Sequence, residues 1–188
     1  MELFNIKKLN SRWFVKNTIY KLFSLSLILY IISFFIGFSL SESIGIKIDK
    51  QIAVPHSFLY YIDHNLKSAM YLGSGILSFS LTTIWYLFIN GCFLGVTFAG
   101  ISSIHSYGFA LGSILTHGVF EIPAINLIGA VGLYPLYFIY SILKNKKVLF
   151  IVHIKNIISM IIFSLFLFVI AGILEAYISP MIIEWMNK

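Results

Sequence analysis

The stretch SAMYLGSGILSFSLTTIWYLFINGCFLGVTFAGISSI, residues 68–104, decides the fold because it contains no charged residue. A helix that crosses a bilayer needs roughly 20 apolar residues, so a run of this length predicts a hairpin of two spans. We expect these spans at about 68–87 and 90–105. The turn between them is expected at Thr82–Tyr86 or at Asn90–Gly91, where polar residues interrupt the run.

The rest of the chain is also rich in apolar residues and poor in charged ones. Of its 188 residues, 59% are hydrophobic and 11% are charged, whereas soluble domains have roughly 45–50% apolar and 25% charged residues. A soluble fold of this length could not hide so much apolar surface. Further apolar runs occupy 22–40, 108–143 and 157–178. The sequence therefore predicts an all-α polytopic transmembrane bundle of about five spans, forming a single integral membrane domain over residues 1–188.

The distribution of basic residues predicts the topology. Residues 1–21 carry five Lys and Arg, and residues 144–155 carry four Lys. By the positive-inside rule, both segments are expected in the cytoplasm, as a basic arm and a basic loop. The connection at 41–67 and the C-terminus are then expected outside, in a multi-pass protein of the cell membrane. A net charge of +6 could suggest nucleic acid, but basic residues that flank apolar runs indicate contact with lipid headgroups instead.

The stretch 108–143 is too long for one upright helix. Two basic cytoplasmic segments require an even number of crossings between them, so this stretch should cross once. It contains Pro123 and Pro135, which interrupt helices. We therefore expect a broken or re-entrant segment after residue 123, or a long tilted helix.

The sequence HGVFEIP, residues 117–123, carries the main candidate site. A charged side chain within a membrane costs roughly 2.5–3.5 kcal/mol on insertion scales, so Glu121 must be protonated, paired or in contact with a wet cavity. His117, four residues earlier, shares its helix face and can pair with it. Gly118 lies between them, and Pro123 weakens the helix just beyond. The motif predicts a polar joint at membrane depth.

This joint has three interpretations: a structural lock, a coupling element that responds to a partner, and a catalytic or metal site. One His and one Glu are too few ligands for zinc, and the sequence shows no nucleophile, base and orienting group together. We therefore expect no catalytic residue, no metal and no cofactor. A second carboxyl, Glu175, is expected near the outer end of the last span. It either reaches water there or faces the same cavity as Glu121.

Glycines with small-x-x-x-small spacing form a second kind of candidate. Gly91 and Gly95 form one such pair, and Gly108 and Gly112 form another. This spacing lets helix backbones approach closely. The pairs can mark the interface of a homo-oligomer or of a partner protein, but packing within the bundle is the interpretation that we favour.

Several of these pieces together resemble a known family. They are the HGxxEIP string at 117–123 with Gly129 and Gly132-Leu133, Asn65-x-Lys67, Asn90-Gly91-x-x-x-Gly95, and Leu174-Glu175-Ala176 before Pro180. Their order and spacing resemble the stage II sporulation protein M family over most of residues 60–180.

The resemblance implies a multi-spanning protein without established enzymatic activity. The founding member of that family is a scaffold that holds a peptidoglycan-degrading complex during engulfment. Other members occur in peptide-bacteriocin systems, where they serve export or self-protection beside ABC-type transporters. The sequence has no nucleotide-binding loop of the type G-x-x-x-x-G-K-[ST], so any ATP dependence would come from another subunit.

We therefore expect a non-enzymatic assembly or accessory component of a membrane complex, with an ABC-type transporter as its partner. One alternative is a sporulation scaffold whose partners are cell-wall hydrolases. The other is an intramembrane hydrolase that uses Glu121 and His117.

Overall fold

A computed structural model describes residues 2–45, 57–145 and 150–186. The regular structure in these ranges is helical, so the prediction of an all-α bundle is confirmed. In chain order the elements are α1 (Glu2–Ile44), α2 (Phe58–Gly73), a 3₁₀ turn (Ser74–Ile76), α3 (Leu81–Ile104), α4 (Tyr107–Gly132), α5 (Tyr134–Leu143), α6 (Phe150–Ile173), the π-helical turn η3 (Leu174–Ile178) and α7 (Ser179–Met186).

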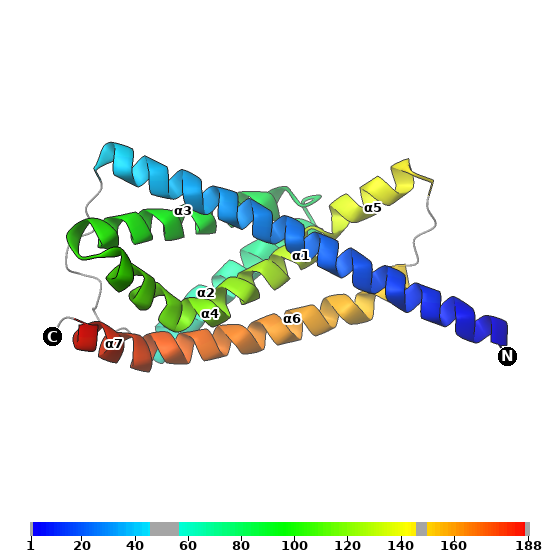
Figure 1. Cartoon of the computed structure of the whole chain (residues 1–188). Helices are drawn as coiled ribbons and strands as arrows, with labels where there is room; N and C mark the ends of the chain where they lie inside the picture. The colour runs from blue at the N-terminus through cyan, green and yellow to red at the C-terminus, as the bar shows by residue number, and fades with distance from the viewer. Residues whose placement is uncertain (1, 46–56, 146–149, 187–188) are drawn as a thin grey trace.

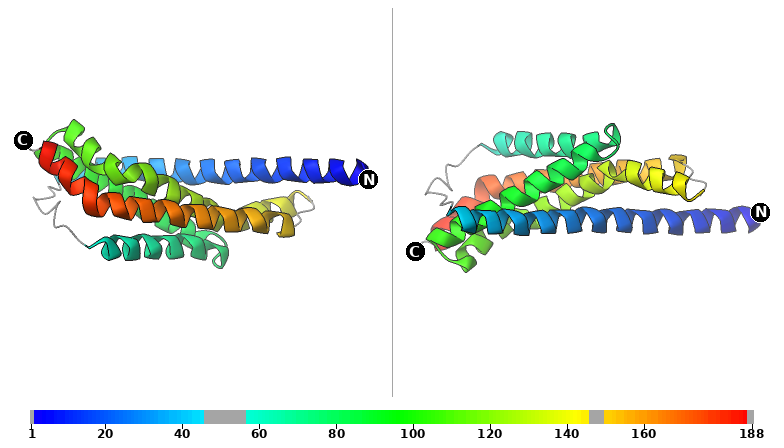
Figure 2. Two further views of the ribbon diagram at one scale, coloured as in Figure 1. Left: turned by 90° about the horizontal axis from the view of Figure 1, so that it is seen from below. Right: turned by 90° about the horizontal axis from the view of Figure 1, so that it is seen from above.

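The helices form an elongated bundle in which α4 and α6 lie between α1 and α2 (Figure 2). The start of α1, the end of α5 and the start of α6 lie at one end (Figure 1). The C-terminus, the end of α1 and the connection from α3 to α4 lie at the other end. The described residues of the two segments predicted to be cytoplasmic therefore lie toward the same end of the molecule. The side of the membrane on which they lie stays a prediction.

Four helical stretches of the described chain are long and apolar enough to cross a membrane: 17–44, 81–104, 107–143 and 153–186. The span predicted at about 68–87 is not a single helix. The chain turns at 74–80, and both predicted turn sites, Thr82–Tyr86 and Asn90–Gly91, lie within α3. The preceding helix, α2, has 16 residues, fewer than the roughly 20 that cross a bilayer.

The physical reason for this turn lies in its serines. The Ser78 hydroxyl accepts a hydrogen bond of 3.1 Å from the backbone N–H of Thr82, so it caps the first turn of α3. Phe79 and Ser80 adopt positive φ angles of 51° and 72°, which reverse the chain. Short polar side chains that bond their own backbone favour turns, and they do so here although the surrounding run is apolar.

Other predicted boundaries also change. The connection predicted at 41–67 is shorter, because α1 continues to Ile44 and α2 begins at Phe58. The loop predicted at 144–155 ends earlier, since α6 begins at Phe150. The basic arm at 1–21 is, from Glu2 onward, the first half of α1. Residues 46–56 and 146–149, which belong to the two predicted connections, lie outside the described residues.

The helix break predicted after the HGVFEIP motif lies further along the chain. Helix α4 continues through Pro123 to Gly132, and the break is at Leu133, just before α5. Pro135 stands in the first turn of α5, where the missing N–H costs little. Pro123 is tolerated inside α4, which is bent along its length (Figure 1).

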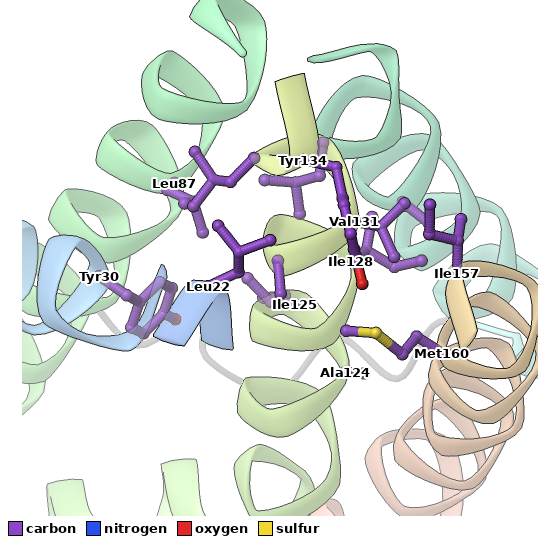
Figure 3. Close-up of a cluster of buried hydrophobic side chains, with 14 of the residues drawn as sticks. Leu22, Tyr30, Leu87, Ala124, Ile125, Ile128, Val131, Tyr134, Ile157 and Met160 are labelled. Carbon is purple, nitrogen blue, oxygen red and sulfur yellow. The ribbon is translucent and has the colours of Figure 1, made fainter. Parts of the chain in front are cut away.

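The hydrophobic core is centred on the second half of α4 (Figure 3). Ile125, Ile128 and Val131 are each at most 3% exposed. They pack against side chains of α1, α3 and α6, among them Leu22 and Met160. Because this half of α4 packs against several other helices, it forms the centre of the hydrophobic core.

Buried hydrogen bonds attach the neighbouring helices to α4. The Ser26 hydroxyl of α1 donates to Asn126 Oδ1 at 2.9 Å. The Ser164 hydroxyl of α6 donates to the carbonyl of Ala124 at 2.8 Å. Polar groups that are paired across helices in an apolar solvent fix the relative positions of these helices.

The most extensive helix contact joins α1 to α3, and glycines permit it. An ideal Cβ on Gly91 would lie 2.5 Å from the carbonyl oxygen of Tyr30, and one on Gly95 would lie 2.7 Å from the backbone nitrogen of Phe38. Gly37 of α1 meets the backbone of Cys92 in the same way. The two backbones touch because no side chain separates them.

Candidate functional site

The first half of α4 carries the two ionisable residues of the motif. His117 and Glu121 are one turn apart and lie on the same face, as helical geometry requires. His117 Nε2 lies 3.7 Å from Glu121 Oε2, and the two side chains are 19% and 23% exposed. The structure therefore places them as a pair that is mostly enclosed.

The π-helical turn η3 brings a third ionisable group to this pair. It contains Glu175 and is followed by Pro180, which has no N–H to continue regular hydrogen bonding. Nitrogen or oxygen atoms of His117, Glu121 and Glu175 all lie within 4.8 Å of one another. A π turn inside a helix often marks a functional position, because it changes the direction of a side chain.

Ser179, the first residue of α7, completes the cluster. Its hydroxyl lies 3.4 Å from His117 Nδ1, while the other ring nitrogen of His117 faces Glu121. Ser179 is 5% exposed. The two ring nitrogens of His117 therefore face polar groups on two different helices, Ser179 on α7 and Glu121 on α4.

These residues line a cavity of about 370 Å³. Its walls come from α1, α2, α3, α4 and the segment from η3 to α7, and they are largely apolar. Further polar groups on the walls are Tyr30, Tyr61, His64, Asn90, Thr97 and Ser113. The cavity walls contain no Lys or Arg among the residues that the structure describes.

The charge balance of this cavity is unusual. Two carboxyl groups face it, and the histidines are the only basic side chains on its described walls. Two carboxylates that are both ionised and so close together in a medium of low polarity repel each other strongly. The cluster therefore needs protons on its carboxyl groups, a protonated His117 beside Glu121, or a bound cation.

The other predicted residues lie at separate places. Gly118 lines the cavity beside His117. Pro123 lies inside α4, just beyond the pair. Gly112 faces α7, where an ideal Cβ would lie 2.8 Å from the sulfur of Met186. An ideal Cβ on Gly108 would have only the Ser106 hydroxyl within reach, at 3.9 Å. Gly91 and Gly95 lie between α1 and α3, away from the cluster.

Sequence reasoning did not single out Ser179 or Tyr30 as site residues. Ser179 directly follows the π turn and precedes Pro180, so an interrupted helix next to Glu175 could have drawn attention to it. Tyr30 lies in an apolar span and reaches the cavity from α1. No local signal in the sequence marks it, because its role depends on the crossing of α1 over α4.

The arrangement supports two kinds of chemistry. Three side chains with nitrogen and oxygen donors can hold a metal ion. Alternatively, Ser179, His117 and Glu121 form a chain of hydroxyl, imidazole and carboxyl, with distances of 3.4 Å and 3.7 Å. Such a chain has the order of a nucleophile, a base and an orienting group, and its distances are long for direct hydrogen bonds.

Comparison with known proteins gives the family. Residues 23–180 match the family described as Stage II sporulation protein M. An uncharacterized protein of Methanocaldococcus jannaschii is 30% identical over 171 residues, which cover 86% of this chain and 96% of that protein. No solved structure matches the chain. The matched region includes the motif, the π turn and Pro180, so the chain belongs to the stage II sporulation protein M family.

Proposed function

We propose that the protein is a non-enzymatic accessory component of a membrane complex, and that its partner is an ABC-type transporter in peptide or bacteriocin export or self-protection. Membership of the family and the apolar helices support an integral membrane protein. The absence of a nucleotide-binding loop from the sequence fits a subunit that depends on another protein for ATP.

The observation that carries the proposal is the position of the ionisable cluster between two structural units. His117 and Glu121 belong to α4, whereas Glu175 and Ser179 belong to the last helical segment. A partner that shifts this segment against α4 would separate these groups and change their pairing. The cluster can therefore couple the state of a partner to the conformation of the bundle.

The test is co-purification from native membranes in mild detergent, followed by mass spectrometry. Wild-type protein should recover subunits of an ABC-type transporter. The variant Glu121→Gln, which keeps the shape of the side chain, should fold but recover at least several-fold less of the partner. The matched control is Thr116→Ala on the same helix, since its hydroxyl bonds only its own helix at 2.8 Å, and it should behave as wild type.

The possible results separate the alternatives. Recovery of cell-wall hydrolases in near-equal amounts would replace the transport role with that of a sporulation scaffold. Recovery of folded protein alone would reject both roles.

A second function is favoured by one specific observation, the contact of Ser179 with His117. An intramembrane hydrolase could use the Ser179 hydroxyl as nucleophile, His117 as base and Glu121 as orienting group. Purified protein would then react with a fluorophosphonate probe, and Ser179→Ala would abolish the labelling. Absence of labelling in folded wild-type protein would count against this function.

A further inference from the structure

We propose that His117, Glu121 and Glu175 bind one divalent transition-metal ion of the zinc type within the membrane-embedded bundle. This inference goes beyond the accessory function and holds whether or not a transporter is the partner. The sequence argument against a metal was that one His and one Glu are too few ligands. Helix packing raises that number to three.

The first support is geometric. Zinc binds nitrogen and oxygen donors at about 2.0–2.2 Å, so its ligand atoms are separated by roughly 3.5 Å. His117 Nε2 and Glu121 Oε2 lie 3.7 Å apart. All three donors lie within 4.8 Å of one another, so small rotations of the side chains would close the site. Three protein ligands beside a cavity are the number found in zinc sites that keep one position open.

The second support is the environment of His117. A histidine that binds a metal usually donates its other ring N–H to a hydrogen-bond acceptor, and this fixes its orientation. Here Nδ1 lies 3.4 Å from the Ser179 hydroxyl, which leaves Nε2 directed toward Glu121. The ring is thus already oriented for binding through Nε2.

The third support is charge. Two carboxylates face one cavity whose described walls carry no Lys or Arg. A divalent cation would neutralise both carboxylates in a region where unpaired charge is costly. The mixed set of one imidazole and two carboxylates suits zinc and related divalent metals better than soft ions such as Cu(I).

The fourth support is the π turn that contains Glu175. The π turn is confined to Leu174–Ile178 and follows the regular helix α6, which has 24 residues. In the structure this turn is the place where α6–α7 brings Glu175 to the pair on α4. π turns are rare, and they occur frequently at functional sites.

The experiment uses the full chain with a streptavidin-binding tag, since a histidine tag would itself bind metals. Protein purified in mild detergent is analysed for metals by inductively coupled plasma mass spectrometry. After treatment with a chelator, it is titrated with Co²⁺ while visible absorption is recorded. We expect the metal analysis to find about one metal ion per chain. The titration should give a visible absorption band that is characteristic of Co²⁺ bound with low-symmetry coordination.

Three variants make the test specific. Glu175→Gln and His117→Ala should each reduce metal content to background and weaken Co²⁺ binding by at least 100-fold. Ser179→Ala should weaken it by roughly 10–100-fold, because only the orientation of His117 is lost. The control Glu42→Gln makes the same chemical change on an exposed residue of α1 and should bind as wild type.

Folding is checked by gel filtration and by thermal unfolding of each variant. Addition of Zn²⁺ to metal-free wild type should raise its melting temperature, since a ligand of the native state stabilises it. The proposal is overturned if folded wild type neither contains a metal nor binds Co²⁺, which would mean that protons balance the two carboxyl groups. It is equally overturned if folded Glu175→Gln and His117→Ala bind as tightly as wild type. Neither result would affect co-purification with a transporter, so the two proposals fail independently.

Discussion

The glycine contact between α1 and α3 gives the sharpest test of the fold. In the variant Gly95→Ala, the new Cβ would lie 2.7 Å from the backbone nitrogen of Phe38 and closer still to the carbonyl of Phe34. Neither atom can rotate away, because both belong to the backbone of α1. The contact with Phe38 alone requires the helices to separate by about 0.7 Å, the difference between 2.7 Å and the 3.4 Å of ordinary contact, and the closer contact with Phe34 requires more.

The loss of stability expected for Gly95→Ala can be estimated from the cost of such overpacking. Overpacking typically costs about 1–3 kcal/mol, and Ala regains up to about 1 kcal/mol of helix propensity over Gly. We therefore expect a net loss of roughly 1–2 kcal/mol. For a chain of this size that loss corresponds to a decrease of about 2–8 °C in melting temperature.

The chain supplies its own reporter for this measurement. Cys92 is the only cysteine in the sequence and is partly buried at the contact with α1. A maleimide dye that fluoresces after reaction with a thiol will therefore report the exposure of this residue during heating in detergent.

Two other glycines provide graded controls. Gly112→Ala should have a smaller effect, because its Cβ would meet the flexible end of Met186. Gly108→Ala should be close to neutral, since its Cβ would have only the Ser106 hydroxyl nearby, at 3.9 Å. A melting temperature for Gly95→Ala equal to that of Gly108→Ala would refute the backbone contact between α1 and α3.

Further predictions concern hydrogen bonds and ion pairs, and the same thiol assay measures them. Thr83→Val removes a buried hydroxyl that donates to the carbonyl of Leu72 at 2.6 Å, so it should cost about 1 kcal/mol, whereas Thr83→Ser should keep most of the stability. Ser26→Ala removes the donor to Asn126 Oδ1 and leaves a buried oxygen without that bond, so a loss of about 1–3 kcal/mol is expected. Asp63→Asn breaks an ion pair of 2.6 Å between side chains that are more than 60% exposed; exposed pairs contribute little, so the melting temperature should not change.

Much of the fold was predictable because a bilayer limits the choice of structure. Long apolar runs must be helices, since each backbone group has to be satisfied within its own segment. The position of the turn at 74–80 was not predictable from hydropathy alone. It depends on the Ser78 hydroxyl and on positive φ angles at Phe79 and Ser80, which leave the apolar pattern unchanged.

The candidate site was likewise predictable only in part. The pairing of His117 with Glu121 follows from helical periodicity, because both residues are on one helix and four positions apart. The approach of Glu175 and Ser179 depends on how α6–α7 packs against α4 and on the π turn between α6 and α7. The sequence left two positions open for Glu175, in water at the end of the span or in the cavity of Glu121, and no signal in one sequence decides between them, so the number of potential metal ligands could not be fixed from it.

The two halves of α4 have different environments, and this difference makes the site testable. From Ala124 to Val131 the helix is almost entirely buried against α1, α3 and α6. The half that carries His117 and Glu121 faces the cavity, and these side chains remain partly accessible. Substitutions at the site should therefore leave the core packed, and Glu121→Gln or Glu175→Gln should lower the melting temperature of metal-free protein less than Gly95→Ala does. The buried half of α4 thus holds the bundle together, and the half beside the cavity carries the accessible side chains that a coupling element or a metal site with an open position requires.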